Sequence, residues 1–443
     1  MSEDDETTRS ATLVSPLEND DLVANSLRLL PALPSSLLHV SLVCKRWYRL
    51  VSSHHFLRQF RAHHRNPPLV GFFSMEWKRI IFTPMLDPPD RIPASRFSLQ
   101  VLPCSTLLSC PHGRVLIYNQ LHKQRLLVWE PVTGELCRVS MPPSFHPTMI
   151  VVHAAVVCAS TEQGHIHGSC HSDPFQVVMV ASDREQFYAF AYSSQAGAWG
   201  NNSLSVKLLP YMKEDDCGIS RRSTLGNSIC FFLAGEKAAA IVEFDWARQT
   251  LAFLDPPSEV SQQLNLLDFH DERCQCLVKS SDSGGLILIV VKLFTVHIWE
   301  RTFNADGVAK WMLWKNTTDL NNLFSLRMVP EDLTAVPLSI LGLDEGGNVL
   351  VKQKESRAIF LVDLESSKFK KLSGTCPVIN DGHPFSTFYT PGKYHTCILQ
   401  LEQKRIYLIS RLLVYRMAFI SEKMINKNFE FELFRSFRCR TDY

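Results

Sequence analysis

Apolar positions in the first part of the chain recur at helical spacing. Leu22, Val23, Leu27 and Leu30 lie on one face of a helix, which predicts one amphipathic helix that Pro31 ends. Further short helices are predicted as far as Val51, and a last one carries Phe56 and Phe60. A unit this small is marginal by itself, so some of its large apolar side chains are expected to face a partner.

From Val70 onward the pattern changes to short apolar strands separated by polar turns. Pairs of strands recur about every fifty to sixty residues, the period of one antiparallel sheet per unit in a radial array. The predicted hairpin strands are 114–118 with 125–129, 176–180 with 187–192, 228–233 with 240–244, 286–291 with 296–299, and 349–351 with 358–362. The pattern predicts a β-propeller-like domain, with a pair of large β-sandwiches as the alternative.

The predicted organisation is therefore multidomain, α followed by all-β. Residues 1–14 hold too few apolar side chains to fold and are expected to form a disordered acidic tail. Residues 15–65 form the helical domain, 66–69 a proline-rich linker, and 70–404 the large antiparallel β domain. Residues 405–443 carry apolar and then aromatic runs that fit either the closing of the last sheet or an appended segment, and both interpretations stay open.

Charge is distributed unevenly along the chain, and its distribution indicates what kind of partner the helical domain binds. The first 21 residues are strongly acidic, whereas residues 22–75 contain no Asp or Glu. The basic residues of that second stretch are Arg28, Lys45, Arg46, Arg49, Arg58, Arg61 and Arg65. A compact basic module indicates an acidic partner, either a protein or a nucleic acid. The interleaved apolar residues favour a packed module over one that reads a nucleic-acid groove.

Composition narrows the class of protein. The 443 residues are 45% hydrophobic and 20% charged, with a net charge of +2, which is ordinary for a protein with a large core. The thirteen cysteines are irregularly spaced and the first ten residues are acidic and polar, so we expect reduced thiols in the cytoplasm, the nucleus or both. Arg411 and Arg416 interrupt the longest apolar run, so no membrane partner is expected.

The sequence offers little for catalysis. The one cluster with metal-ligand residue types consists of His165, His167, Cys170 and His171. It stands in a single polar segment, whereas zinc ligands usually come as paired motifs far apart, so no metal site is predicted. Cys274 and Cys276 have the spacing of alternating strand positions rather than of a redox motif. We therefore predict no catalytic residue, no metal and no cofactor, and a protein that is not an enzyme.

The helical segment resembles the F-box. The resemblance rests on Leu17 to Leu22, Leu30-Pro31, Leu42-Val43-Cys44-Lys45-Arg46-Trp47, Leu50-Val51 and Phe56. The run from Leu42 to Trp47 is the most specific part, and the stretch as far as Phe73 looks like the large F-box families of grasses. The resemblance implies docking to the acidic Skp adaptor of an SCF-type ubiquitin ligase and, through it, to a cullin scaffold. The β domain is similar to F-box-associated propeller-like domains, which implies binding of an unknown target protein.

The resemblance also implies which residues contact the Skp adaptor. They are Leu17, Leu22, Leu27, Leu30, Pro31, Leu37, Val43, Cys44, Trp47 and Leu50. The first helix departs from the family pattern, because Glu18 follows Leu17 where proline is usual and Ser26 stands where an aliphatic residue is usual. These departures imply weaker adaptor binding, or a shifted register in which Leu29 substitutes. The alternative function is a propeller-based binding or enzymatic module with no ligase role.

Overall fold

The computed structural model describes residues 19–388 with interruptions. The undescribed positions within that span are 77–78, 121–124, 161–165, 168–169, 171–172, 202, 210–217, 220–222, 226, 235–238, 264–273, 281–284, 293–294, 305, 315–317, 320–337, 354–355, 364–365, 367 and 376–381. The predicted segments 1–14 and 405–443 therefore lie outside the described residues. The chain divides into two compact units, and the second consists of Asn66–Thr387, so the described part has boundaries between Arg65 and Asn66 and between Thr387 and Phe388.

The first unit contains four short helices. They are α1 (Asp20–Arg28), α2 (Pro34–Val43), α3 (Lys45–Ser52) and α4 (His54–His64). The Asn19 side chain caps α1 by accepting hydrogen bonds from the amides of Asp21 and Leu22, and Ser53 caps α4 in the same way through the amide of Phe56. The apolar core of the unit consists of Val23, Leu27, Leu30, Leu37, Val40, Trp47, Val51, Phe56 and Phe60. None of the helices that the structure describes has both the length and the apolar character of a membrane span.

The second unit is built from antiparallel sheets, of which the described residues form six. Blade 1 contains β1 (Leu69–Glu76), β2 (Arg79–Pro84), β3 (Leu99–Gln100) and β27 (His383–Ser386). Blade 2 contains β4 (Ser105–Ser109), β5 (Val115–Asn119), β6 (Arg125–Trp129) and β7 (Leu136–Ser140). Blade 3 contains β8 (Ile150–Cys158), β9 (Phe175–Ser182), β10 (Gln186–Ser193), β11 (Ala198–Trp199) and β12 (Leu204–Lys207).

The remaining blades follow in chain order. Blade 4 contains β13 (Gly218–Ile219), β14 (Ser223–Leu225), β15 (Ser228–Ala234), β16 (Ala239–Asp245) and β17 (Thr250–Leu254). Blade 5 contains β18 (Cys274–Ser280), β19 (Leu286–Lys292), β20 (Thr295–Phe303), β21 (Ala309–Leu313) and β22 (Thr318–Asp319). Blade 6 contains β23 (Leu338–Leu343), β24 (Val349–Gln353), β25 (Ala358–Asp363) and β26 (Lys368–Thr375). Short helices η2 (Ala94–Arg96), η3 (Pro111–Gly113) and α5 (Ser258–Gln263) lie between strands.

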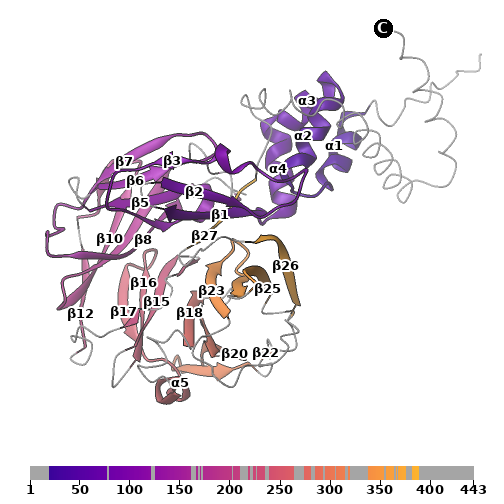
Figure 1. The fold of residues 1–443 in the computed structure, drawn as a ribbon. Helices are drawn as coiled ribbons and strands as arrows, with labels where there is room; N and C mark the ends of the chain where they lie inside the picture. Colours follow the sequence, from indigo (N-terminus) through magenta and orange to yellow (C-terminus); the bar gives the residue numbers. More distant parts are fainter. Residues whose placement is uncertain are drawn as a thin grey trace, which may run out of the picture. The chain divides into compact units, whose positions relative to one another are not determined.

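The sheets stand as blades around a common centre (Figure 1), so the predicted fold class is confirmed and the sandwich alternative is excluded. Neighbouring blades share hydrophobic cores. Between blades 3 and 4, for example, the rings of Phe187 and Phe231 lie 5.8 Å apart, and between blades 1 and 2 those of Phe73 and Trp129 lie 5.5 Å apart. A single blade has two apolar faces, so stacking against both neighbours is what buries them.

Blade 1 closes the ring with strands from opposite ends of the domain. β27 pairs antiparallel with β1, Phe73 opposite His383, and the rings of Phe73 and Phe385 lie 4.9 Å apart. Gly71 allows the close pairing of β1 with β2, because a Cβ there would overlap the Thr83 carbonyl and the Phe82 ring. Sequence periodicity indicated five hairpin units, and this sixth sheet is the one it did not reveal.

Candidate functional site

The helical unit leaves several large apolar side chains on its surface although its core is filled. Leu22 is 44% exposed, Leu29 43%, Val43 38% and Tyr48 50%. Exposed apolar groups on so small a unit are typical of a docking surface for another protein. Helices α1, α2 and α3 contribute them.

The junction of α2 and α3 presents the most specific part of the sequence motif. Val43 is the last residue of α2, and Cys44 is extended and separates α2 from α3. The Cys44 Sγ accepts a hydrogen bond from the amide of Trp47 at 3.5 Å and so caps α3. Both Val43 and Cys44 are exposed, whereas Trp47, at 8%, is buried in the core. The motif thus combines two exposed residues at the α2–α3 junction, Val43 and Cys44, with a tryptophan that packs in the core and holds α3 in place.

The predicted adaptor-binding residues fall into two groups. Leu22, Pro31, Val43 and Cys44 are exposed and available to a partner. Leu27, Leu30, Leu37 and Trp47 are buried inside the unit, and Leu50 is half-buried. The buried group packs in the core of the unit, so a substitution there would change adaptor binding indirectly, by destabilising the helices. Leu17 lies outside the described residues.

The outer face of α1 carries an interrupted apolar row. Leu22, Ser26 and Leu29 follow one another at spacings of four and three, so they share one side of the helix. Ser26 turns its hydroxyl back to the Leu22 carbonyl, with Oγ donating at 3.0 Å. The row therefore has a polar gap between two exposed leucines. Leu29 is exposed on this side, and its substitution for Ser26 stays a prediction.

An exposed ion pair joins α1 to α3, and further basic side chains lie on the surface of the unit. Arg46 of α3 pairs with Asp20 at the start of α1, with 2.7 Å between Nη2 and Oδ1. Lys45, Arg49 and Arg58 are exposed. Partial burial and the adjacent His63 both lower the pKa of His64. The exposed Lys and Arg side chains give the surface of the unit positive charge, which suits an acidic partner.

The propeller carries a concavity at the outer end of blades 1 and 2. Its volume is about 530 Å³, and it is lined by Leu99, Gln100, Val101, Leu102, Asn119, Arg125, Leu127, Leu136 and Arg138. Four leucines provide apolar wall, and the exposed Arg125 and Arg138 provide positive charge. The sequence did not reveal this pocket, because its residues come from β3, the connection that follows it and three strands of blade 2, and only the packing of blade 1 against blade 2 brings them together.

Comparison with known proteins gives two family matches. The F-box domain model matches residues 19–59, and the model described as F-box protein AT5G49610-like, beta-propeller, matches residues 106–392. F-box domains generally bind Skp-type adaptors, and the pairing with a propeller is typical of non-enzymatic substrate adaptors. No curated protein matches the chain.

Among solved structures, similar folds occur in proteins of low identity. Virginiamycin B lyase from Staphylococcus aureus is 9% identical over 70% of this chain and 88% of its own, with a TM-score of 0.32. The Cps50 (Swd1) beta-propeller domain of Myceliophteria thermophila is 12% identical over 71% and 85%, with a TM-score of 0.35. A protein from Lactobacillus plantarum is 12% identical over 72% and 88%, with a TM-score of 0.34. Likenesses this distant carry no inference about function.

The family match is of a different kind, since the propeller model covers well over half of the chain and the F-box model covers the helices that precede it. The F-box model spans the helices from α1 into α4, and the propeller model spans blades 2 to 6 together with β27 of blade 1. The chain belongs to the family of F-box proteins with an AT5G49610-like beta-propeller.

Proposed function

We propose that this chain is the substrate-recognition adaptor of an SCF-type ubiquitin ligase, acting in the cytoplasm, the nucleus or both. Its helical unit docks to a Skp-type adaptor, which links it to a cullin scaffold, and its propeller holds the target. Catalysis then belongs to the partners, and this chain supplies proximity and orientation. The observation that carries the proposal is the exposure of Leu22, Leu29 and Val43 around a core that is already complete.

The exposed corner at Val43 allows a test that leaves the fold alone. Val43→Asp places a carboxylate on the docking surface, and burying an unpaired charge at an interface costs several kcal/mol. Trp47 is unsuitable for this purpose, because it lies in the core and its loss would unfold the unit. Ala62→Asp is the matched control, since Ala62 is exposed near the end of α4 just as Val43 is exposed at the end of α2.

The measurement is calorimetric titration of the full-length chain with a purified Skp-type adaptor. We expect Val43→Asp to weaken binding at least a hundredfold and Ala62→Asp to change it less than threefold. Circular dichroism of both variants should match the parent chain. Absence of binding by the parent chain, or equal binding by Val43→Asp, would count against the proposal.

The pocket between blades 1 and 2 is the proposed place for the target. Leucine walls with Arg125 and Arg138 at the surface suit a peptide that carries an apolar side chain beside an acidic one. Proximity labelling in cells with full-length Val43→Asp should accumulate targets that the parent chain removes. Adding Arg125→Glu and Arg138→Glu to this variant should abolish that labelling. In the chain that keeps Val43, the same two changes should leave binding of the Skp-type adaptor intact. Unchanged labelling would place the target elsewhere on the propeller.

A further inference from the structure

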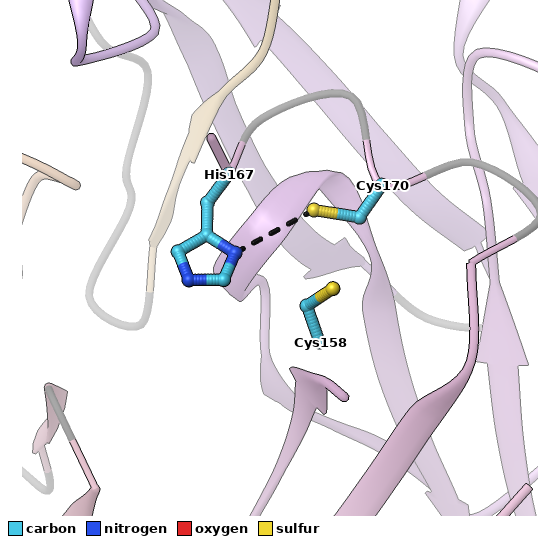
Figure 2. A group of neighbouring side chains, drawn as sticks. All are labelled: Cys158, His167 and Cys170. Carbon is cyan, nitrogen blue, oxygen red and sulfur yellow. Dashed lines mark hydrogen bonds between the residues drawn. The ribbon is translucent and has the colours of Figure 1, made fainter. Parts of the chain in front are cut away.

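Two thiols and an imidazole converge beside the end of β8. Cys158 is the last residue of that strand, and His167 and Cys170 belong to the connection that leads to β9. Each offers one ligand atom, and the three atoms all lie within 4.8 Å of one another. Figure 2 shows both sulfurs and one ring nitrogen of His167 turned toward one another. These are the ligand types that zinc prefers in proteins.

The separations agree with a tetrahedral site. Zn–S bonds of about 2.3 Å and Zn–N bonds of about 2.05 Å put a ligating nitrogen about 3.6 Å, and a second sulfur about 3.8 Å, from a given sulfur. The Nδ1 of His167 lies 3.6 Å from the Sγ of Cys170. The widest separation in the group is at most 4.8 Å, so closure around an ion requires a contraction of about 1 Å or less.

Groups from two other blades hold the ligands in place. The His112 ring stacks on that of His167, with centroids 3.9 Å apart and planes 7° apart, and its Nδ1 accepts a hydrogen bond from the Cys158 amide at 2.9 Å. Glu345, between β23 and β24, accepts from the His112 amide at 2.7 Å. Such outer contacts orient the ligands of metal sites and contribute to affinity.

The buried Arg114 fixes the other side of the group. Its guanidinium pairs with Glu130 at 2.7 Å and donates to the carbonyls of Cys170 at 2.5 Å and Asp173 at 2.7 Å. Cys170 is fully buried, Cys158 is partly exposed, and His167 is exposed. The site is therefore rigid on its inner side and open to solvent at His167.

We propose that Cys158, His167 and Cys170 bind a zinc ion as a Cys₂His site whose fourth position faces solvent. Binding replaces two S–H protons by two Zn–S bonds, so two protons are released for each ion and the site becomes electrically neutral. The ion fastens the β8–β9 connection to the end of β8. The fourth position takes water, or a donor group from a bound protein.

The first experiment measures metal in the purified full-length chain by inductively coupled plasma mass spectrometry. We expect about one zinc per chain, its loss in the double variant Cys158→Ser with Cys170→Ser, and at least a tenfold weaker retention in His167→Ala. The control is Cys104→Ser with Cys137→Ser, which removes two exposed thiols elsewhere and should leave the zinc content unchanged. A parent chain without zinc after supplementation, or zinc retained by the Cys158/Cys170 variant, overturns the proposal.

A second experiment uses only the parent chain, so its result does not depend on whether a variant folds. Chelator-treated parent chain is titrated with Co²⁺, which should give tetrahedral visible bands and a thiolate-to-cobalt band of two-thiolate intensity, both abolished by Zn²⁺. Mass spectrometry after alkylation should find Cys158 and Cys170 protected by Zn²⁺, and Cys104 and Cys137 equally labelled with or without it. Absence of the cobalt bands overturns the metal site. If a reductant removes the protection of Cys158 and Cys170 and Zn²⁺ does not restore it, the two cysteines form a disulfide, and this result also overturns the metal site.

Discussion

Replacing Ser26 by leucine should tighten binding of the Skp-type adaptor, because it fills the polar gap in the apolar row of α1. Ser26 lies between Leu22 and Leu29 on one side of the helix, and both leucines are about two-fifths exposed. A leucine between them should expose a similar share. Full burial of a leucine side chain is worth about 1.5–3 kcal/mol, so covering two-fifths contributes about 0.6–1.2 kcal/mol, or roughly a three- to eightfold lower Kd.

The assay is calorimetric titration of full-length variants with the Skp-type adaptor, with urea unfolding as a check on stability. Ala24→Leu is the matched control, since Ala24 is partly exposed on α1 but two positions from both Leu22 and Ser26, and residues two apart on a helix face different directions. Both changes alter helix propensity by only a few tenths of a kcal/mol. An unchanged Kd for Ser26→Leu, or equal tightening by Ala24→Leu, would refute the placement of the docking surface on this side of α1.

Two further predictions concern the propeller. Arg114→Met should lower the free energy of unfolding by about 3–5 kcal/mol, because it leaves the buried Glu130 carboxylate without its cation, and adding Glu130→Met should recover much of that loss. Urea unfolding followed by tryptophan fluorescence measures both, and a loss below about 1 kcal/mol for the single variant would contradict the pairing. Burial raises the pKa of Glu345 from 4.5 to about 7, so the folded chain holds a proton that the unfolded chain releases between these values. The free energy of unfolding should therefore fall as pH rises from 4.5 to 7. Glu345→Gln keeps an acceptor for the His112 amide and should flatten this pH dependence. Urea midpoints that change in parallel for the parent chain and the variant across that range would contradict the prediction.

The middle strands of five blades could be predicted from the sequence because each is a continuous apolar run with a turn beside it. β9 with β10 and β19 with β20 are examples, and their residues match the predicted hairpins. The first blade could not be predicted, because β27 has only four residues and pairs with a strand more than three hundred positions earlier. No local pattern encodes a pairing over that distance.

The sequence motif of the docking surface could be recognised from the sequence, but which of its residues are exposed and which are buried could not. Alternation of apolar residues marks Val43 and Trp47 equally, and only the packing of α2 against α3 makes the first exposed and the second buried. The thiol–imidazole group shows the same limit. His167 and Cys170 stood out as ligand types, whereas Cys158 belongs to a buried strand and joins them only because the β8–β9 connection returns to the end of that strand.

The proposed zinc site and the proposed target pocket lie at opposite ends of one strand. β5 begins at Val115, directly after Arg114, which holds the carbonyl of Cys170, and it ends at Asn119, which lines the pocket. Five residues of strand span roughly 15 Å, and every residue of β5 is buried, so the strand separates the two sites rigidly. Loss of the ion should therefore loosen the β8–β9 connection while the pocket keeps its shape. A target lost together with the zinc would then bind at the open coordination position, and a target lost only with Arg125 and Arg138 would bind in the pocket.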